Sequence, residues 1–191
     1  MFLVTAQSFA NEIVDQLQPF CQRIHIAGSI RREKPEVKDI EIVCLPKLEH
    51  VPTDLFGEGY TRVVPGFQAA VEKLSHTIIK GKFGGRYMQF TLAKHRHATV
   101  DLFTPTAQDY YRQLAIRTGS AEYAKEVIAK SWMAKGWCGA GEDGLRMQKH
   151  CIKKPDGWKC INKTDDLPPA WESEEEFFEW LGVAYIQPRF R

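Results

Sequence analysis

The chain lacks the features of an exported or membrane-spanning protein. Its first residues, MFLVTAQSFANEIVDQL, have no basic segment at the start, and Asn11 and Glu12 come too early for a signal peptide. No apolar run approaches the roughly 18 residues that cross a bilayer. The five cysteines are odd in number and form no Cys-x-x-Cys pair, which favours reduced thiols. We therefore expect a soluble, cytoplasmic protein with no membrane partner.

A large excess of charge of one sign is also missing. The 26 Lys and Arg residues against 24 Asp and Glu leave a net charge of +2, so total charge does not by itself indicate a nucleic-acid partner. The charges are unevenly distributed, however. Five basic and no acidic residues lie between Lys80 and Arg96, whereas seven acidic and no basic residues lie between Asp165 and Glu179. These blocks predict one basic patch and one acidic tail.

Hydrophobic periodicity predicts a mixed sheet with a few helices on one face in the first hundred residues. A spacing of three and four predicts a helix over residues 6–20, and another is expected near 66–75. Alternation predicts strands, which we place at 23–28, 39–45, 86–93 and 98–104, with a hairpin turn at 94–97.

The character of the chain changes near residue 107, which predicts two domains, 1–107 and 108–191. The second is expected to be small and mostly helical, so the fold class is α+β. Its first long helix should end at Gly136, and residues 137–170 should hold a small hairpin and loops. Ser173 and Glu176 form a capping-box pattern for a last helix that Gly182 ends.

Three acidic residues lie on two of the predicted strands. Asp39 and Glu41 are two residues apart, so their side chains share one face of the strand. Asp101 points away from its apolar neighbours on another strand, and pairing of the two strands would bring it alongside. Three carboxylates without His or Cys suit Mg²⁺. Two such ions held close together are a common device for in-line phosphoryl transfer.

The residues before the acidic pair are suited to phosphate. Gly28 allows close approach of the backbone, Ser29 can donate a hydrogen bond, and Arg31 or Arg32 supplies a planar cation. An isolated Asp-x-Glu is usually only the solvent face of a strand. The joint pattern of strand, Gly-Ser, Arg-Arg, Asp-x-Glu and a later strand Asp is far more specific.

These motifs resemble those of the nucleotidyltransferase superfamily, and more narrowly those of the family X (beta-like) DNA polymerases. The similar segments are GSIRREKPEVKDIE, TVDLF, RTGS and the C-terminal EEEFFEWLGVAYIQPRFR. Glu41 stands where a second Asp is commoner, and Thr99 where an Arg often precedes the third Asp. The match implies a minimal palm (1–107) and thumb (108–191), as in some phage- or virus-encoded members.

The resemblance also implies roles for individual residues. Asp39, Glu41 and Asp101 would hold two Mg²⁺ ions, with Mn²⁺ able to substitute, and Asp101 would lie nearest the primer 3′-hydroxyl. The implied nucleotide-binding residues are Gly28, Ser29, Arg32, Arg117, Thr118 and Gly119. The expected DNA contacts are Lys80, Lys82, Arg86 and Lys125, because phosphate contacts supply most non-specific affinity.

The sequence thus predicts a monomeric DNA polymerase that adds dNMP from dNTP to a primer 3′ end by two-metal phosphoryl transfer. Primer-template or gapped DNA is the expected partner, and gap filling in DNA repair the expected use. Two alternatives remain: a nucleotidyltransferase that modifies a small molecule or a protein, and a DNA-binding module without catalysis. Zinc binding is also left open at four residues whose spacing fits no common finger: Cys138, His150, Cys151 and Cys160.

Overall fold

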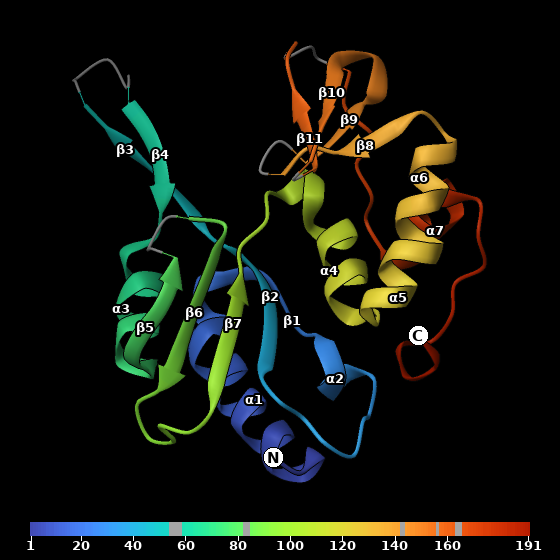
Figure 1. Cartoon of the computed structure of the whole chain (residues 1–191). Coiled ribbons are helices and arrows are strands. Elements are labelled where there is room, and N and C mark those ends of the chain that lie inside the picture. Colours follow the sequence, from blue (N-terminus) through green and yellow to red (C-terminus); the bar gives the residue numbers. More distant parts are fainter. Residues whose placement is uncertain (54–58, 82–84, 142–143, 156, 163–165) are drawn as a thin grey trace. The chain divides into compact units, whose positions relative to one another are not determined.

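The computed structural model describes all residues except 54–58, 82–84, 142–143, 156 and 163–165 (Figure 1). It divides into two compact units, Met1–Pro105 and Thr106–Arg191; the sequence placed this change near residue 107. The mixture of helices with a mixed sheet confirms the expected α+β class. No helix in the described part of the chain is long and apolar enough to cross a membrane.

The first unit is built on a five-stranded sheet with the order β1-β2-β7-β6-β5. Its central pair, β2 and β7, is parallel, and the other neighbours are antiparallel. The strand bounds are β1 Cys21–Ile26, β2 Ile40–Pro46, β5 Ser75–Gly81, β6 Tyr87–Leu92 and β7 Thr99–Phe103. The sheet is therefore mixed, as the sequence predicted.

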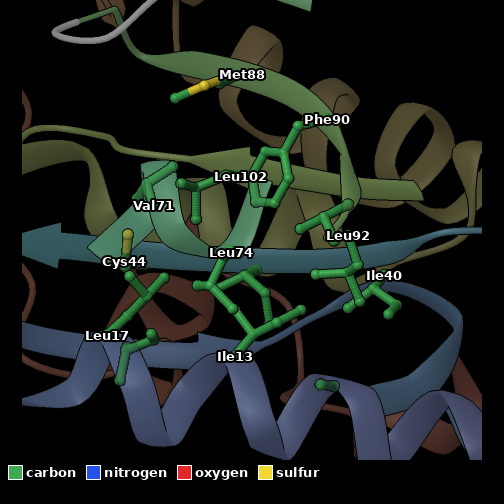
Figure 2. Close-up of a cluster of buried hydrophobic side chains, with 14 of the residues drawn as sticks. Ile13, Leu17, Ile40, Cys44, Val71, Leu74, Met88, Phe90, Leu92 and Leu102 are labelled. Atoms are coloured by element: carbon green, nitrogen blue, oxygen red, sulfur yellow. The ribbon is translucent and has the colours of Figure 1, made fainter. Parts of the chain in front are cut away.

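Two helices cover one face of this sheet (Figure 1). They are α1, Leu3–Leu17, and α3, Pro65–Leu74. Figure 2 shows Ile13 and Leu17 of α1 and Leu74 of α3 among the buried side chains of the strands. Alternate residues of β2 and β7 point into this core, which leaves the intervening residues on the opposite face.

Some elements differ from the prediction. Helix α1 stops at Leu17, because Pro19 lies in a short 3₁₀ turn, η1 (Gln18–Phe20). The edge strand β5 was missed, since most of its residues are exposed and its apolar residues do not alternate. A separate hairpin, β3 (Leu48–Pro52) with β4 (Gly59–Val63), follows β2 and was also missed (Figure 1).

In its described residues, the second unit combines helices with two small hairpins. Its helical elements are η2 Ala107–Asp109, α4 Tyr110–Thr118, α5 Ala121–Tyr123, the π-helical segment η3 Ala124–Ala129, α6 Lys130–Ala134, η5 Gln148–His150, α7 Glu174–Leu181 and η6 Pro188–Phe190. The hairpins pair β8 (Trp137–Gly139) with β9 (Leu145–Met147), and β10 (Cys151–Lys154) with β11 (Gly157–Cys160). The sequence had predicted one hairpin here.

The last helix has the caps that the sequence predicted. The Ser173 hydroxyl accepts a hydrogen bond from the backbone N–H of Glu176 at 3.1 Å. The Glu176 carboxylate in turn accepts from the N–H of Glu172 at 2.7 Å, one residue before the expected donor. Gly182 ends α7 with a φ of 77°, a conformation that favours glycine. Local sequence is therefore sufficient to define both ends of this helix.

A compact apolar core holds α7 in the second unit. Phe177 and Phe178 of α7 are fully buried and pack with Trp132 and Trp171. Arg191 packs against this core and contacts two residues of α7. Its Nη1 donates to Glu174 Oε1 at 2.9 Å, and both side chains are almost wholly buried. The guanidinium also lies 4.6 Å from the centre of the Phe178 ring, which adds a cation–π contact.

Candidate active site

Of the three acidic residues singled out in the sequence, two lie on the same face of the first unit's sheet and the third comes just before it. Glu41 of β2 and Asp101 of β7 are directly paired in the parallel register. The residues on either side of them are buried against the helices, so both carboxylates lie on the face opposite the helices. Asp39 comes immediately before β2. The parallel β2–β7 pairing thus brings together acids that are about sixty positions apart in the sequence.

The electrostatics show that Asp39 lies close to another negative charge. Burial raises the pKa of Asp39 above its ordinary value, and the charge of Asp101 raises it further. Lys38 and a backbone hydrogen bond oppose this shift without cancelling it. A cation between Asp39 and Asp101 would remove the repulsion and offset the loss of hydration. This pair therefore fits a positively charged ligand.

Asp101 is held by two side chains of the neighbouring strand β6. The Tyr87 hydroxyl donates to Asp101 Oδ1 at 2.9 Å, and Gln89 Nε2 donates to the same oxygen at 2.8 Å. Neither residue was predicted from the sequence to be part of the site. A signal was present, because Tyr87 and Gln89 are two positions apart on a strand predicted to form a hairpin with the strand of Asp101.

Glu41 packs closely over Gly28. A Cβ atom built on Gly28 would lie 1.8 Å from Glu41 Oε2 and 2.7 Å from its Cδ, distances at which atoms overlap. Gly28 also has a φ of +61°, a conformation that other residues rarely adopt. Only glycine therefore satisfies both the backbone conformation and the space left by Glu41.

The predicted phosphate-binding segment forms a single helical turn, α2, Gly28–Arg31. It is joined to β2 by a hydrogen bond from Ala27 N–H to Glu41 O at 2.8 Å. Arg32 follows the turn, and its N–H donates to Gly28 O at 3.1 Å. Ser29 and Arg32 are both partly exposed. The turn therefore begins beside Glu41 and carries the Ser29 hydroxyl, and Arg32 follows it directly. The sequence predicted that both side chains bind phosphate.

The residue types fit Mg²⁺, because all three candidate donors are carboxylate oxygens. Among the described residues, however, no three His, Cys, Asp or Glu side chains are gathered so as to hold a metal ion. Glu41 lies against Gly28, and one oxygen of Asp101 already accepts two hydrogen bonds. The strand pairing thus places Glu41 beside Asp101. In the described residues, however, the carboxylates do not converge on a single metal position.

The other expected nucleotide-binding residues belong to the second unit. Arg117 lies in the last turn of α4, Thr118 ends that helix and is fully buried, and Gly119 follows it. Ser120 then caps α5 by accepting a hydrogen bond from the N–H of Tyr123 at 3.2 Å. The RTGS motif is therefore the junction between two helices.

The expected DNA contacts have different surroundings. Lys80 of β5 is exposed and pairs with Gln89, which pairs with Asp101, so Lys80 belongs to the same row across the sheet. Arg86 is exposed just before β6. Lys125, in the second unit, is highly exposed, and its Nζ lies 3.6 Å from Glu126 Oε1. Lys82 lies outside the described residues.

The four residues left open as zinc ligands do not form such a site in the described part of the chain. Cys151 and Cys160 are cross-strand partners in the β10–β11 hairpin. Burial, reinforced by these two neighbouring thiols, raises the pKa of Cys138 to about 12, which favours the protonated thiol over the thiolate that binds metal. His150 instead lies 3.1 Å from Asp166, measured from Nε2 to Oδ2.

No family model matches this sequence, and no curated protein sequence matches it. Among solved structures, the chain is similar to a crystal structure of Leishmania infantum polymerase beta in a ternary P/T complex. The TM-score is 0.66 at 18% sequence identity, and the alignment covers 100% of this chain and 76% of the other. The protein therefore has a fold similar to that of polymerase beta.

Proposed function

We propose that the protein is a DNA polymerase that transfers dNMP from dNTP to a primer 3′ end and fills short gaps during repair. The observation that carries the proposal is the pairing of Glu41 with Asp101, next to Asp39, on the face of the sheet opposite the helices. The polymerase beta-like fold supports it, because polymerase beta is the protein whose architecture this chain shares. The sequence motifs agree with both observations.

In this proposal the three carboxylates would hold Mg²⁺. When bound, two Mg²⁺ ions would lower the pKa of the attacking hydroxyl and offset charge on the leaving group. Asp101, nearest the primer, accepts the proton of the 3′-hydroxyl. The 3′-oxygen bonds to the α-phosphorus as the bond to the bridging oxygen breaks, and pyrophosphate leaves. Asp39 and Glu41 act on the side of the site where the triphosphate binds.

The remaining proposed roles concern binding. Ser29 and Arg32 donate to the triphosphate, since a hydroxyl and a guanidinium are suited to phosphate oxygens. Lys80 contacts the DNA backbone from the same face of the sheet as Asp101.

The test is extension of a labelled primer by purified protein with Mg²⁺ and dNTPs, on one-nucleotide gapped DNA, on an open template and without template. Asp101→Asn should abolish incorporation while DNA binding, measured by fluorescence anisotropy, stays within about two-fold, because the substitution removes a charge that repels DNA rather than a DNA contact. Incorporation that survives in Asp101→Asn would show that the acid assignment is wrong.

A folded wild-type protein that extends none of the DNA substrates would refute the polymerase proposal. In that case nucleotide transfer to small molecules and to proteins, assayed with labelled nucleotide, would distinguish another transferase from a DNA-binding module.

A further inference from the structure

The carboxylate of Asp101 is restrained more strongly than its position on the strand requires. Oδ1 accepts hydrogen bonds from both the Tyr87 hydroxyl, at 2.9 Å, and Gln89 Nε2, at 2.8 Å. Among the described residues Asp101 has no further hydrogen-bond partner. A carboxylate oxygen has about two acceptor sites, so Oδ1 is fully used within the protein and Oδ2 keeps its capacity. The two oxygens of Asp101 are therefore not equivalent.

Both donors are held in place by the sheet. Gln89 is the direct cross-strand partner of Asp101, so the strand register itself places its side chain next to the carboxylate. Tyr87 is the cross-strand partner of Phe103, and the two rings stack with centroids 5.1 Å apart. This stack fixes the direction of the Tyr87 ring, and hence of its hydroxyl, along the diagonal towards Asp101.

We propose that Tyr87 and Gln89 are positioning residues that hold Asp101 so that one oxygen, Oδ2, serves both the metal ion and the primer hydroxyl. The inference rests on the proposed polymerase function for its reaction and on the hydrogen bonds of Tyr87 and Gln89 to Asp101 for its geometry. This role requires a hydrogen-bond donor at positions 87 and 89. A residue of similar size that donates nothing leaves the carboxylate free to rotate, and an acidic residue at position 89 repels it.

The experiment compares Tyr87→Phe, Gln89→Met and Gln89→Glu with Thr91→Val. Thr91 is the matched control, because it lies on the same strand two residues from Gln89 but pairs with Thr99 rather than Asp101. Single-turnover incorporation on gapped DNA should fall by about 10-fold to 100-fold in Tyr87→Phe and Gln89→Met, as is typical when a partner of a metal ligand is removed. The KM for dNTP should change little, and Thr91→Val should behave as wild type.

The relative activities of Gln89→Met and Gln89→Glu distinguish a positioning role of Gln89 from a packing role. If Gln89 only fills space or supplies polarity, Gln89→Glu is the milder change, since its shape is nearly that of glutamine. If Gln89 acts as a donor, Gln89→Glu is the more damaging, because it places a second negative charge against Asp101. Equal activity of all three variants and wild type, with folding verified by circular dichroism, would overturn the proposal.

Binding of Mn²⁺, followed by electron paramagnetic resonance of the free ion, provides a readout that does not need DNA. Weaker Mn²⁺ binding in Tyr87→Phe and Gln89→Met, by about 10-fold, would support the positioning role even if no DNA substrate is extended, and only the proposed function would then fail. Mn²⁺ binding that is lost in Asp101→Asn but unchanged in these variants would refute the positioning role alone. Wild-type protein that binds no Mn²⁺ would overturn both.

Discussion

Replacing Gly28 by Ala should damage the candidate site more than it damages the fold. The added methyl group would overlap the Glu41 carboxylate, whose Oε2 would lie 1.8 Å away, and would lie 3.1 Å from the Glu41 Cβ. The carboxylate can rotate away, whereas its Cβ is attached to a strand at the centre of the sheet. The substitution should therefore displace the Glu41 carboxylate and press α2 away from β2.

The backbone adds a second, separable effect. The φ of +61° at Gly28 is in the left-handed region, where a residue with a Cβ is destabilised by about 1–2 kcal/mol. For a chain of this length, that corresponds to a fall in Tm of roughly 2–8 °C. Incorporation should fall by at least about 10-fold, a typical minimum for disturbing the surroundings of a metal ligand.

Gly136→Ala is the matched control for the backbone effect. Gly136 has a φ of +80°, and a Cβ built there meets nothing within 4 Å. Its Tm should fall by a similar amount without loss of incorporation. Adding Glu41→Ala to Gly28→Ala removes the overlapping carboxylate, so the double variant should regain part of the lost stability. If the Gly28 and Gly136 variants are equal in both Tm and incorporation, the steric argument is refuted.

Three further outcomes follow from the structure. The pKa of Asp39 is raised in the folded protein above its ordinary 3.8, so the carboxylate destabilises the fold once the pH exceeds the raised value. Asp39→Asn should therefore raise the Tm in EDTA at pH 7, and the gain should shrink as the pH falls towards 4; a gain that is independent of pH would contradict this cause. Arg191→Met should lower the free energy of unfolding in urea by about 3–5 kcal/mol, because it breaks a buried ion pair by removing one partner; a loss below about 1 kcal/mol would show that the pair is not needed. Ser173→Ala should lower it by about 1 kcal/mol through loss of the α7 cap, whereas Ser173→Asp, which retains an acceptor, should lose much less.

The elements that could be predicted from the sequence are those whose signals are local. The ends of α7 follow from Ser173, Glu176 and Gly182, all within one segment. The alternation in β2 separates buried Ile40 and Ile42 from the partly exposed Glu41, so its two faces could be assigned before any pairing was known. By contrast, β5 is a strand because it pairs with β6 at the edge of the sheet, and its own residues hardly indicate it.

The candidate site divides in the same way. The sequence by itself determined which acids are candidates for the chemistry, because residue type and a two-residue spacing place Asp39 and Glu41 on one side of a predicted strand. Their alignment with Asp101 was decided by the parallel β2–β7 register, a long-range pairing that no local pattern encodes. The hydrogen bonds from Tyr87 and Gln89 to one oxygen of Asp101 likewise form only when β6 lies beside β7. The physical reason is that spacing along a strand depends on covalent geometry, whereas contacts between strands depend on how the whole core packs.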